Sequence, residues 1–435
     1  MTFTTIFTVV ADFGMGPVLT REVARYPEYT DKYLSTIFWT KGIFGLGAYL
    51  AVVFFVNVLN YSELTKLLVY LSGITMFFDN LHAAFYSVFR ARKNLIYESV
   101  GIVASQAITL AVGSLVLLLH WPLYWLILAY TIPSILNFIY AAYFLRKVYS
   151  LKYSFIFDKN VFKLFLMLAW PFALAGIISR LYSYSDSLLM SKMLSAQALG
   201  WWSVPYKITF AFQFIPAALS ASIFPVMSAL YVDQKEKIGE LFLKSWRYLF
   251  TIVLPLAFGI IALADPIILK LYKPQYAPAI PVLRILMISL IFGFLGFITA
   301  AVLNATNHQK KQTSLLAVAL FVNILLNLYL LPRSGIMGAA VAALVSNIVL
   351  CLGGLWYCNK IILIDKLILF KYLNQSFWPA ATMGVLCFYL SKYLHFIFVI
   401  PIGALVYFVA LFMIGGIDRN LIARTYNKIF KNQVI

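Results

Sequence analysis

The chain has 435 residues, of which 63% are hydrophobic and only 11% are charged, and its formal net charge is +19. Soluble domains have about 45–50% apolar and about 25% charged residues, so this composition excludes an ordinary soluble protein and predicts a polytopic membrane protein. The positive charge does not point to nucleic acid, because the basic residues lie in short loops between apolar segments, as the positive-inside rule describes.

Membrane-spanning helices need about 20 mostly apolar residues each. Thirteen segments of the chain fit this requirement, and the segment 377–391 is the shortest of them. They are 1–18, 36–59, 66–89, 96–118, 121–145, 164–190, 203–228, 247–263, 281–304, 313–331, 337–358, 377–391 and 394–414.

The loops between these spans alternate in their basic residues. One set of loops holds 24 Lys and Arg residues, and the other set holds 7. The positive-inside rule places the richer set in the cytoplasm. This set includes the loops 146–163 and 229–247 and the tail from 415, so the C-terminus is predicted to be cytoplasmic and Met1 external.

A weak internal repeat relates the two halves of the chain. The sequence FRARKNLIYES near 90–99 resembles LNATNHQKKQTS near 303–314 in position and character, with an offset of about 213–218 residues. The repeat predicts two six-helix lobes around a central cavity and two further C-terminal helices, with the first helix missing. The expected domains are 1–150, 151–360 and 361–435, and an upstream apolar segment is expected in the DNA.

The first span ends in Asp12-Phe13-Gly14-Met15-Gly16, followed by Arg21-Glu22-Val23-Ala24. Glycines in a membrane helix permit a break or a close helix approach. Two interpretations of Asp12 stay open. It is either a polar group at the membrane interface or a gate contact with a basic loop residue such as Arg21.

The third span carries a stripe of polar side chains at helical spacing. A carboxylate, an imidazole and a phenol in one line could relay protons or bind a coupling cation. The alternative is a self-satisfied polar stripe between packed helices. The stripe consists of Thr75, Asp79, His82, Tyr86 and Arg90.

The segment from Trp170 to Pro225 is the most informative part of the chain, because charged residues interrupt two apolar spans. A charge in a membrane helix costs roughly 2.5–3.5 kcal/mol on insertion scales, so it faces protein or water rather than lipid. One polar arc contains Ser179, Arg180, Ser183, Asp186 and Ser187. The next span has a face formed by Ser203, Tyr206, Phe210, Gln213, Ala217 and Ser220, with Lys207 at its edge. Facing polar arcs of this kind predict the wall of a wet cavity.

Further polar and irregular positions follow the same pattern. Asn323 and Asn327 are four residues apart on one face, and Ser346-Asn347 lies in the next span. These amides tie helices together or contact sugars. Four prolines, Pro171, Pro205, Pro216 and Pro225, predict bent or broken helices next to a cavity.

No hydrolase or transferase constellation is found in the sequence. There is no glycine-rich phosphate loop and no paired carboxylate motif for a metal, so we predict no enzymatic activity, no cofactor and no metal site. The three cysteines, Cys351, Cys358 and Cys387, lie within or at the ends of apolar segments. We expect buried, reduced thiols there.

These motifs together resemble the Wzx-type polysaccharide and oligosaccharide flippases (O-antigen and capsule) of the multidrug/oligosaccharidyl-lipid/polysaccharide exporter superfamily. The resemblance covers essentially the whole chain. It rests on Asp12-Phe13-Gly14 with Arg21-Glu22-Val23-Ala24, on Trp170-Pro171 with Asp186, and on Gly200-Trp201 leading to Tyr206-Lys207 and to Pro216 and Pro225. The absent first helix is a departure from the family's fourteen helices.

The resemblance implies a multi-pass protein of the cell (inner or plasma) membrane that moves a polyprenyl-pyrophosphate-linked oligosaccharide by alternating access. Arg180 and Lys207 would hold the phosphates, Asp186 would tune these cations, and Tyr206 and Gln213 would contact the substrate. Asp79, His82, Arg90 and Asp12 are the candidate coupling or gate residues. A polysaccharide polymerase and chain-length proteins are candidate partners.

Two other classes of protein stay open. A multidrug or cation antiporter of the same superfamily would favour an acidic cavity, whereas the central pair of spans holds two cations and one acid. A membrane glycan polymerase would carry a long external loop with clustered Arg or His. The longest external loop here, around 264–281, carries only the basic residues Lys270 and Lys273.

Overall fold

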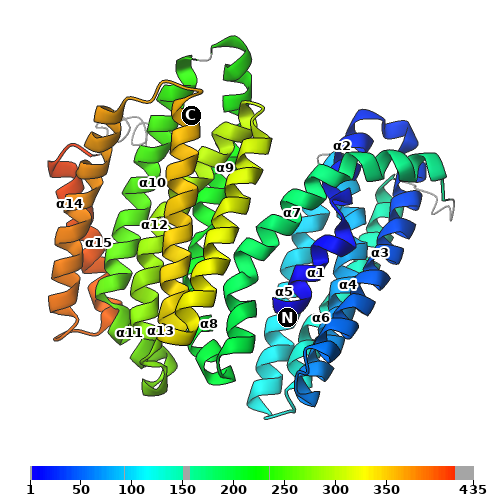
Figure 1. Cartoon of the computed structure of the whole chain (residues 1–435), viewed down its shortest axis with the longest axis horizontal. Coiled ribbons are helices and arrows are strands. Elements are labelled where there is room, and N and C mark those ends of the chain that lie inside the picture. Colours follow the sequence, from blue (N-terminus) through cyan, green and yellow to red (C-terminus); the bar gives the residue numbers. More distant parts are fainter. Residues whose placement is uncertain (1, 93, 150–156, 235, 417–435) are drawn as a thin grey trace, which may run out of the picture. The chain divides into compact units, whose positions relative to one another are not determined.

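The computed structural model describes residues 2–92, 94–149, 157–234 and 236–416. Within these residues every regular element is a helix (Figure 1). The chain divides into two compact units, Met1–Tyr184 and Ser185–Ile435, and each is described by itself. The predicted boundaries after residues 150 and 360 stay a prediction.

The first unit is a bundle of long helices. It contains α1 (Thr2–Asp12), α2 (Met15–Arg25), the short 3-10 helix η1 (Pro27–Tyr29), α3 (Thr30–Val58), α4 (Glu63–Ala91), α5 (Ile96–Leu118), α6 (Tyr124–Tyr149) and most of α7 (Lys159–Met193). Its core includes Met15 and Leu19 of α2, Phe89 of α4 and Phe165 of α7, all fully buried.

The first predicted span is broken into α1 and α2. Phe13 and Gly14 between them have positive φ angles of 45° and 69°, which a continuous right-handed helix does not allow. Gly14 also lies against the backbone of α7, since a Cβ atom built on it would be 2.8 Å from the carbonyl oxygen of Ala169 and the amide nitrogen of Ala173. Glycine is therefore required at this position both by conformation and by space.

Gly14 meets α7 at the place where α7 itself bends. The segments Lys159–Trp170 and Phe172–Met193 are inclined by 46°. Pro171 between them has no N–H to donate to the preceding turn, which is the usual cause of a sharp kink. The predicted bend at Pro171 is therefore present, and the break between α1 and α2 packs against it.

The start of α7 is fixed by a capping carboxylate outside the spans. Oδ1 of Asp158 accepts hydrogen bonds from the backbone N–H groups of Asn160 and Val161 at 2.8 and 3.0 Å. Its Oδ2 lies 2.7 Å from Nζ of Lys32. The hydrogen bond from Lys32 holds the pKa of Asp158 below its usual range.

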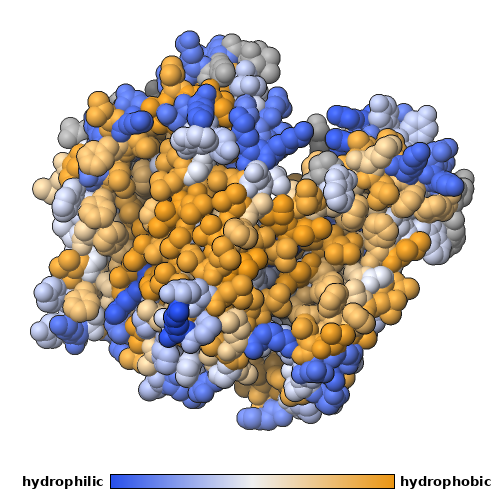
Figure 2. Space-filling view, viewed as in Figure 1, coloured by the Kyte–Doolittle hydropathy of each residue, from blue (hydrophilic) through white to orange (hydrophobic). Residues whose placement is uncertain are grey.

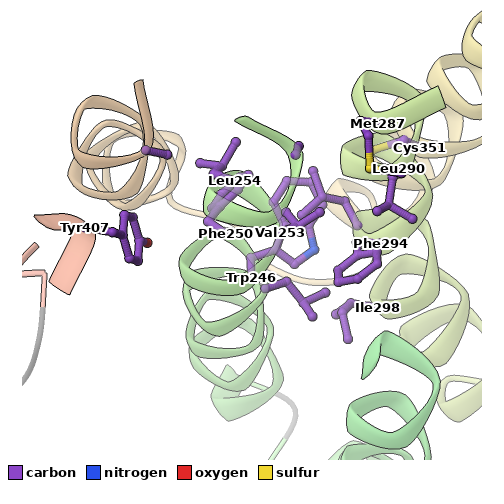
Figure 3. Close-up of a cluster of buried hydrophobic side chains, with 14 of the residues drawn as sticks. Trp246, Phe250, Val253, Leu254, Met287, Leu290, Phe294, Ile298, Cys351 and Tyr407 are labelled. Atoms are coloured by element: carbon purple, nitrogen blue, oxygen red, sulfur yellow. The ribbon is translucent and has the colours of Figure 1, made fainter. Parts of the chain in front are cut away.

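The second unit contains the end of α7 and all later helices. They are α8 (Ala196–Phe212), α9 (Phe214–Asp233), α10 (Glu236–Ala262), α11 (Ala264–Tyr272), the 3-10 helix η2 (Pro274–Tyr276), α12 (Ala279–Ala305), α13 (Gln309–Asn359), α14 (Lys366–Leu390) and α15 (Phe396–Met413). Figure 3 shows the centre of its core. Trp246, Phe250 and Val253 of α10 face Leu290 and Phe294 of α12, all of them buried.

The element α13 is two antiparallel helices joined by a tight turn. Gly335 has φ 54° and ψ −137°, which are not helical values. The two halves of α13 lie against each other, as two contacts between them show. A Cβ atom built at Gly353 would meet the side chain of Leu315, and Nζ of Lys311 lies 5.6 Å from the ring centre of Tyr357. The two predicted spans 313–331 and 337–358 are therefore both present.

The prediction of a polytopic all-α membrane protein is confirmed. In the described part of the chain ten helices are long and apolar enough to cross a membrane, or eleven if the bent α7 is counted as one span. In each unit hydrophobic surface covers the middle of the helices, and hydrophilic residues lie at their ends (Figure 2).

The predicted spans and loops differ from the helices in other places as well. The span 203–228 is divided into α8 and α9. The segment 377–391 belongs to the 25-residue helix α14, which is long enough to span but is not among the ten apolar helices. The predicted external loop 264–281 contains α11 and η2. Residues 93, 150–156 and 235 of the predicted cytoplasmic loops, and the tail from 417, lie outside the described residues.

The expectation for the cysteines is also confirmed. Cys351, Cys358 and Cys387 are buried and form no disulfide with one another. Because these thiols are buried, we expect them to react little with thiol reagents, so cysteines can be introduced into the natural chain for labelling.

Substitution of Gly335 by alanine should destabilise the second unit through the backbone alone. A Cβ atom there would meet no heavy atom within 4 Å, but the φ of 54° is strained for alanine, at a cost of about 1–3 kcal/mol. Gly113→Ala in α5 is the matched control, since its Cβ atom also meets nothing and the site is helical. Thermal unfolding in detergent should show a lower Tm for Gly335→Ala only. Equal Tm values for the two variants would contradict a required glycine at the turn.

Candidate functional site

The charged residues of the central helices have two different environments. Arg180 and its neighbour Ser179 are exposed on α7. Lys207 is exposed on α8. Among the described residues neither cation has a carboxylate within ion-pair distance. Arg180 belongs to the first unit and Lys207 to the second, and each is described within its own unit.

Asp186 lies six residues after Arg180 on α7 but is buried, with only 7% of its surface exposed. Nδ2 of Asn327, on the first half of α13, donates a hydrogen bond of 2.6 Å to Oδ1 of Asp186. The same amide lies 3.1 Å from Oδ1 of Asn323, and Ser185 donates a hydrogen bond of 2.8 Å to that oxygen. The four side chains join α7 to α13 within the second unit.

This cluster separates Asp186 from the cations that the sequence placed beside it. No ion pair between Asp186 and Lys207 is found in the described structure, and the carboxylate is instead held by carboxamides. Asn323 and Asn327 therefore join two helices, which is one of the two alternatives open from the sequence.

A cation site at this cluster must also be considered, because carboxylate and carboxamide oxygens are ligands that hard cations accept. The described residues contain no group of three or more His, Cys, Asp or Glu side chains arranged for a metal.

The other predicted substrate residues lie on or directly after α8. Tyr206 is half-buried, and its ring stacks between those of Trp202 and Phe210. Gln213 is exposed at the junction where α8 ends and α9 begins. Lys207 lies one residue after Tyr206. Three of the predicted residues are therefore within about two helical turns of one another.

In the first unit a charge pair is buried beside the break between α1 and α2. Nζ of Lys41 in α3 is fully buried and forms an ion pair with Oδ1 of Asp12. It also lies 3.3 Å from Oδ1 of Asn80 in α4. Nδ2 of Asn80 donates to the backbone carbonyl oxygens of Ala11 at 3.1 Å and of Lys41 at 3.0 Å.

This network satisfies the groups that the helix break would leave unpaired. Where α1 ends, its last carbonyls have no partner in the next turn, and Asn80 supplies one to Ala11. The ion pair neutralises Lys41, which is surrounded by apolar helices. Three helices are thereby joined at one point, and this point lies next to the contact of Gly14 with α7.

Asp12 does not contact Arg21, the example of a basic partner that one of its two interpretations named, and it pairs with Lys41 instead. Arg21 forms an ion pair of 2.9 Å with its neighbour Glu22, because the break turns α2 and leaves Asp12 against α3. The sequence analysis assigned no role to Lys41, which lies within the predicted span 36–59. An intramembrane lysine is itself a signal that a buried acid is nearby, and Asp12 was an available partner.

The polar stripe of α4 is partly used in packing against α6. Thr75 is bonded to Thr131 at 2.8 Å, and Tyr86 donates to Asn137. Asp79 accepts a hydrogen bond from Ser134 and lies 3.8 Å from Nδ1 of His82. These bonds identify α6 as the partner helix that the sequence could not name.

Three members of the stripe are distinguished by their surroundings. The side chain of Asp79 keeps 52% of its surface exposed. Nδ1 of His82 is buried without a hydrogen-bond partner in the described structure. Arg90 turns away from the stripe and binds Glu98 at the start of α5 through two nitrogen atoms. Asp79 and His82 therefore remain candidates for coupling, and Arg90 joins α4 to α5.

The fold is similar to that of solved membrane proteins. The structure described as lipid II flippase MurJ, inward closed conformation, superposes with a TM-score of 0.73 and covers 94% of this chain and 95% of that chain, at 19% identity. At this identity the likeness concerns the fold. The protein is a multi-pass, all-α membrane protein with this fold.

Comparison with family models identifies the family. The model described as polysaccharide biosynthesis protein matches residues 1–231, which is more than half of the chain. The chain therefore belongs to the polysaccharide biosynthesis protein family. A second model, MatE, matches residues 171–329.

Curated relatives agree with this assignment. A protein of Haloferax volcanii named probable flippase is 27% identical over 207 residues, which cover 46% of this chain and 43% of that protein. The teichuronic acid biosynthesis protein TuaB of Bacillus subtilis is 23% identical over 397 residues, which cover 89% of this chain and 80% of the relative. The chain spans less than half the length of the first curated relatives it matches.

Removal of the Asp12 carboxylate should destabilise the protein more than removal of both charges. Asp12→Asn leaves Lys41 buried without a counter-ion, and breaking such a pair costs about 3–5 kcal/mol when both partners are buried. The side chain of Asp12 is 32% exposed, so water should relieve part of this cost. The double variant Asp12→Asn/Lys41→Met should recover stability, which thermal unfolding in detergent measures.

The surface pair of Glu63 and Lys66 is the control for this experiment, because the Glu63 side chain is 88% exposed. Glu63→Gln should leave Tm unchanged, as expected for a solvent-screened pair. A double variant of Asp12 and Lys41 that unfolds at a lower temperature than Asp12→Asn alone would contradict the ion pair as the reason for the loss.

Proposed function

We propose that this protein is a flippase for a polyprenyl-pyrophosphate-linked oligosaccharide. In this function it moves the repeat unit of a cell-surface polysaccharide from the cytoplasmic to the outer leaflet by alternating access. It acts as a transporter and not as an enzyme. The bilayer and the lipid-linked oligosaccharide are its partners, and a polysaccharide polymerase and chain-length proteins are further candidates.

The observation that carries the proposal is the exposure of cations in the central helices. Arg180 on α7 and Lys207 on α8 are both exposed and have no carboxylate at ion-pair distance among the described residues. A charge facing lipid at this depth costs roughly 2.5–3.5 kcal/mol, so these cations are expected to face water or an anion. The pyrophosphate of a lipid-linked sugar is an anion that must cross the apolar slab.

The burial of Asp186 strengthens this argument. Its carboxylate is bonded to Asn327 and is 7% exposed, so it does not neutralise the surface of α7 and α8. Arginine offers a planar fork that binds two phosphate oxygens at once, and lysine offers a point charge. Arg180 is therefore proposed as the principal phosphate anchor and Lys207 as a second cation.

A cation antiporter is the second candidate, because one acid of the first unit is accessible. The side chain of Asp79 is 52% exposed and lies 3.8 Å from Nδ1 of His82. The exposed charged residues of α7 and α8 are nevertheless all cations, which favours an anionic substrate. A glycan polymerase is disfavoured, because the segment 264–276 is occupied by the short helices α11 and η2 and not by a long loop.

The protein is a multi-pass membrane protein consistent with the plasma membrane, and we propose that its C-terminus is cytoplasmic. The support is the distribution of 24 basic residues in one set of loops against 7 in the other. Lys159 at the start of α7 and Lys237 at the start of α10 belong to the richer set of predicted loops, and both are exposed. Lys270 on α11 belongs to the poorer set and is also exposed.

Introduced cysteines should distinguish the two faces of the membrane. Lys159→Cys and Lys237→Cys should react with a membrane-impermeant maleimide only after the cells are opened. Lys270→Cys should react in intact cells and serves as the positive control. The buried natural cysteines contribute little background. Labelling of Lys159→Cys in intact cells would reverse the proposed orientation.

Arg180→Ala should reduce export while leaving the protein inserted. Loss of a hydrogen bond to a charged group costs about 1.5–3 kcal/mol, so transport should fall by roughly tenfold or more. Arg180→Lys should retain part of the activity, because the charge remains and the planar fork is lost. The measurement is surface glycan in a flippase-deleted host, with the membrane protein level determined in parallel.

Arg333→Ala is the control for Arg180→Ala. Arg333 is also an exposed arginine, and it lies 3.6 Å from the ring centre of Tyr329 near the turn of α13. It should export normally. Normal export by a well-expressed Arg180→Ala variant would refute the phosphate anchor and leave Lys207 as the cation to test.

A further inference from the structure

A ladder of aromatic rings follows one side of α8. The rings of Trp202 and Tyr206 are stacked with centroids 6.1 Å apart and planes inclined by 24°. Those of Tyr206 and Phe210 are stacked at 6.1 Å and 22°. Phe214, the first residue of α9, continues the series with its ring edge-on at 6.4 Å from Phe210.

The rings become more exposed along this ladder. Trp202 is 1% exposed and anchors the ladder in the core against α12 and α13, whereas Tyr206 is half-buried. Phe210 is 42% exposed and Phe214 is 72% exposed. A helix that needed these rings only for packing would bury them, so the exposed end of the ladder requires another explanation.

The exposed end does not have the character of a lipid-facing surface. At about 100° per residue, Tyr206, Phe210 and Gln213 fall within an arc of roughly 60°. Lys207 lies about 60° beyond Phe210 and is exposed. A lysine and a glutamine at this depth are costly in lipid, so this face of α8 is expected to contact water or a polar ligand.

Gln213 lies where α8 ends and α9 begins. Its φ of −65° and ψ of −15° are right-handed helical values, so Ala196–Ser228 remains one span. Pro216 has no N–H and cannot donate to the carbonyl of Phe212 four residues earlier. The side chain of Gln213 is exposed at this junction, and a carboxamide within a span is expected to contact water or a polar ligand.

We infer that Tyr206, Phe210 and Phe214 form a track for the sugar rings of the lipid-linked oligosaccharide. The apolar C–H face of a pyranose packs on an aromatic face, while its hydroxyl groups need polar neighbours such as Gln213. Lys207 beside the track complements the negative pyrophosphate to which the sugars are attached. The inference rests on the proposed flippase function and adds a binding site for the glycan part of its substrate.

Stacking also explains a property that a flippase of this kind needs. Ring faces recognise sugars through shape and apolar contact and impose few directional bonds, so successive sugars can occupy the same rings. Rings at i, i+4 and i+8 along one helix repeat every 6 Å, as the measured centroid distances show. This spacing is close to one turn of the helix, so the rings form a regular series along α8.

The test compares two ligands on the purified full-length protein in nanodiscs. One probe is polyprenyl pyrophosphate carrying the host's oligosaccharide repeat unit, and the other is polyprenyl pyrophosphate without sugars. The variants are Tyr206→Ala and Phe210→Ala, with Phe210→Trp and Tyr206→Phe as ring-conserving variants. Phe408→Ala is the matched control, because Phe408 is an aromatic of α15 that is 55% exposed. Binding is measured by native mass spectrometry titration, and Tm values confirm folding.

We expect each alanine variant to bind the sugar-bearing lipid roughly 3- to 10-fold more weakly, the loss expected for one aromatic contact. Binding of the bare lipid should be unchanged. The ring-conserving variants and Phe408→Ala should bind both probes normally.

Two other outcomes would contradict the sugar track, and they differ in whether the proposed flippase function survives. An equal loss for both lipids, or no loss for either, would show that the ladder does not bind sugar, while the flippase function stands. Wild-type protein that binds neither lipid would remove the proposed function, and the sugar track with it.

Discussion

The structure depends on one constraint, which is that polar groups within the apolar layer must find partners inside the protein. The pair of Lys41 and Asp12 shows how strict this is. The ammonium group of Lys41 is fully buried, and two other helices supply its partners, α1 through Asp12 and α4 through the side chain and backbone of Asn80. The same constraint places Asp186 against Asn327 in the second unit. Both clusters join helices through polar side chains whose burial without a partner would cost folding free energy.

The same constraint governs the places where helices are broken. Between α1 and α2 the freed carbonyl of Ala11 is bonded by Asn80, and Gly14 permits the contact with the bent helix α7. In α13 the turn at Gly335 returns the chain to form an antiparallel pair. At Gln213, where α8 meets α9, the backbone keeps helical angles, and the exposed side chain lies beside the aromatic ladder. The satisfied breaks stabilise the bundles, whereas the exposed polar side chains of α8 are expected to contact water or a ligand.

This contrast separates structural from functional polar residues in the proposed flippase. Asp12, Lys41, Asn323 and Asn327 are occupied by one another or by their neighbours, so their removal should affect folding first. The structure shows no ion pair of Arg180 or Lys207 among the described residues, and the rings of Phe210 and Phe214 are exposed. Removal of these side chains should therefore affect substrate binding before it affects folding. Asp79 and His82 have features of both the structural and the functional residues, because Asp79 accepts a hydrogen bond from Ser134 and its side chain is still half exposed.

The sequence by itself determined the class of protein, most of the helices, the intramembrane charges and the bend at Pro171. These depend on composition and on local spacing, which are properties of short stretches of chain. It did not determine which polar groups pair. Asp186 and Asn327 are 141 residues apart, and Lys41 and Asp12 are 29 apart on different helices, so their meeting depends on the packing of whole helices. For this reason the sequence left the role of Asp12 open, with Arg21 as one candidate partner, and it placed Asp186 with the cations near it in the chain. Only the tertiary structure decided these partners, because the free energy of burying a charge is settled by the nearest group in space and not by the nearest group in the chain.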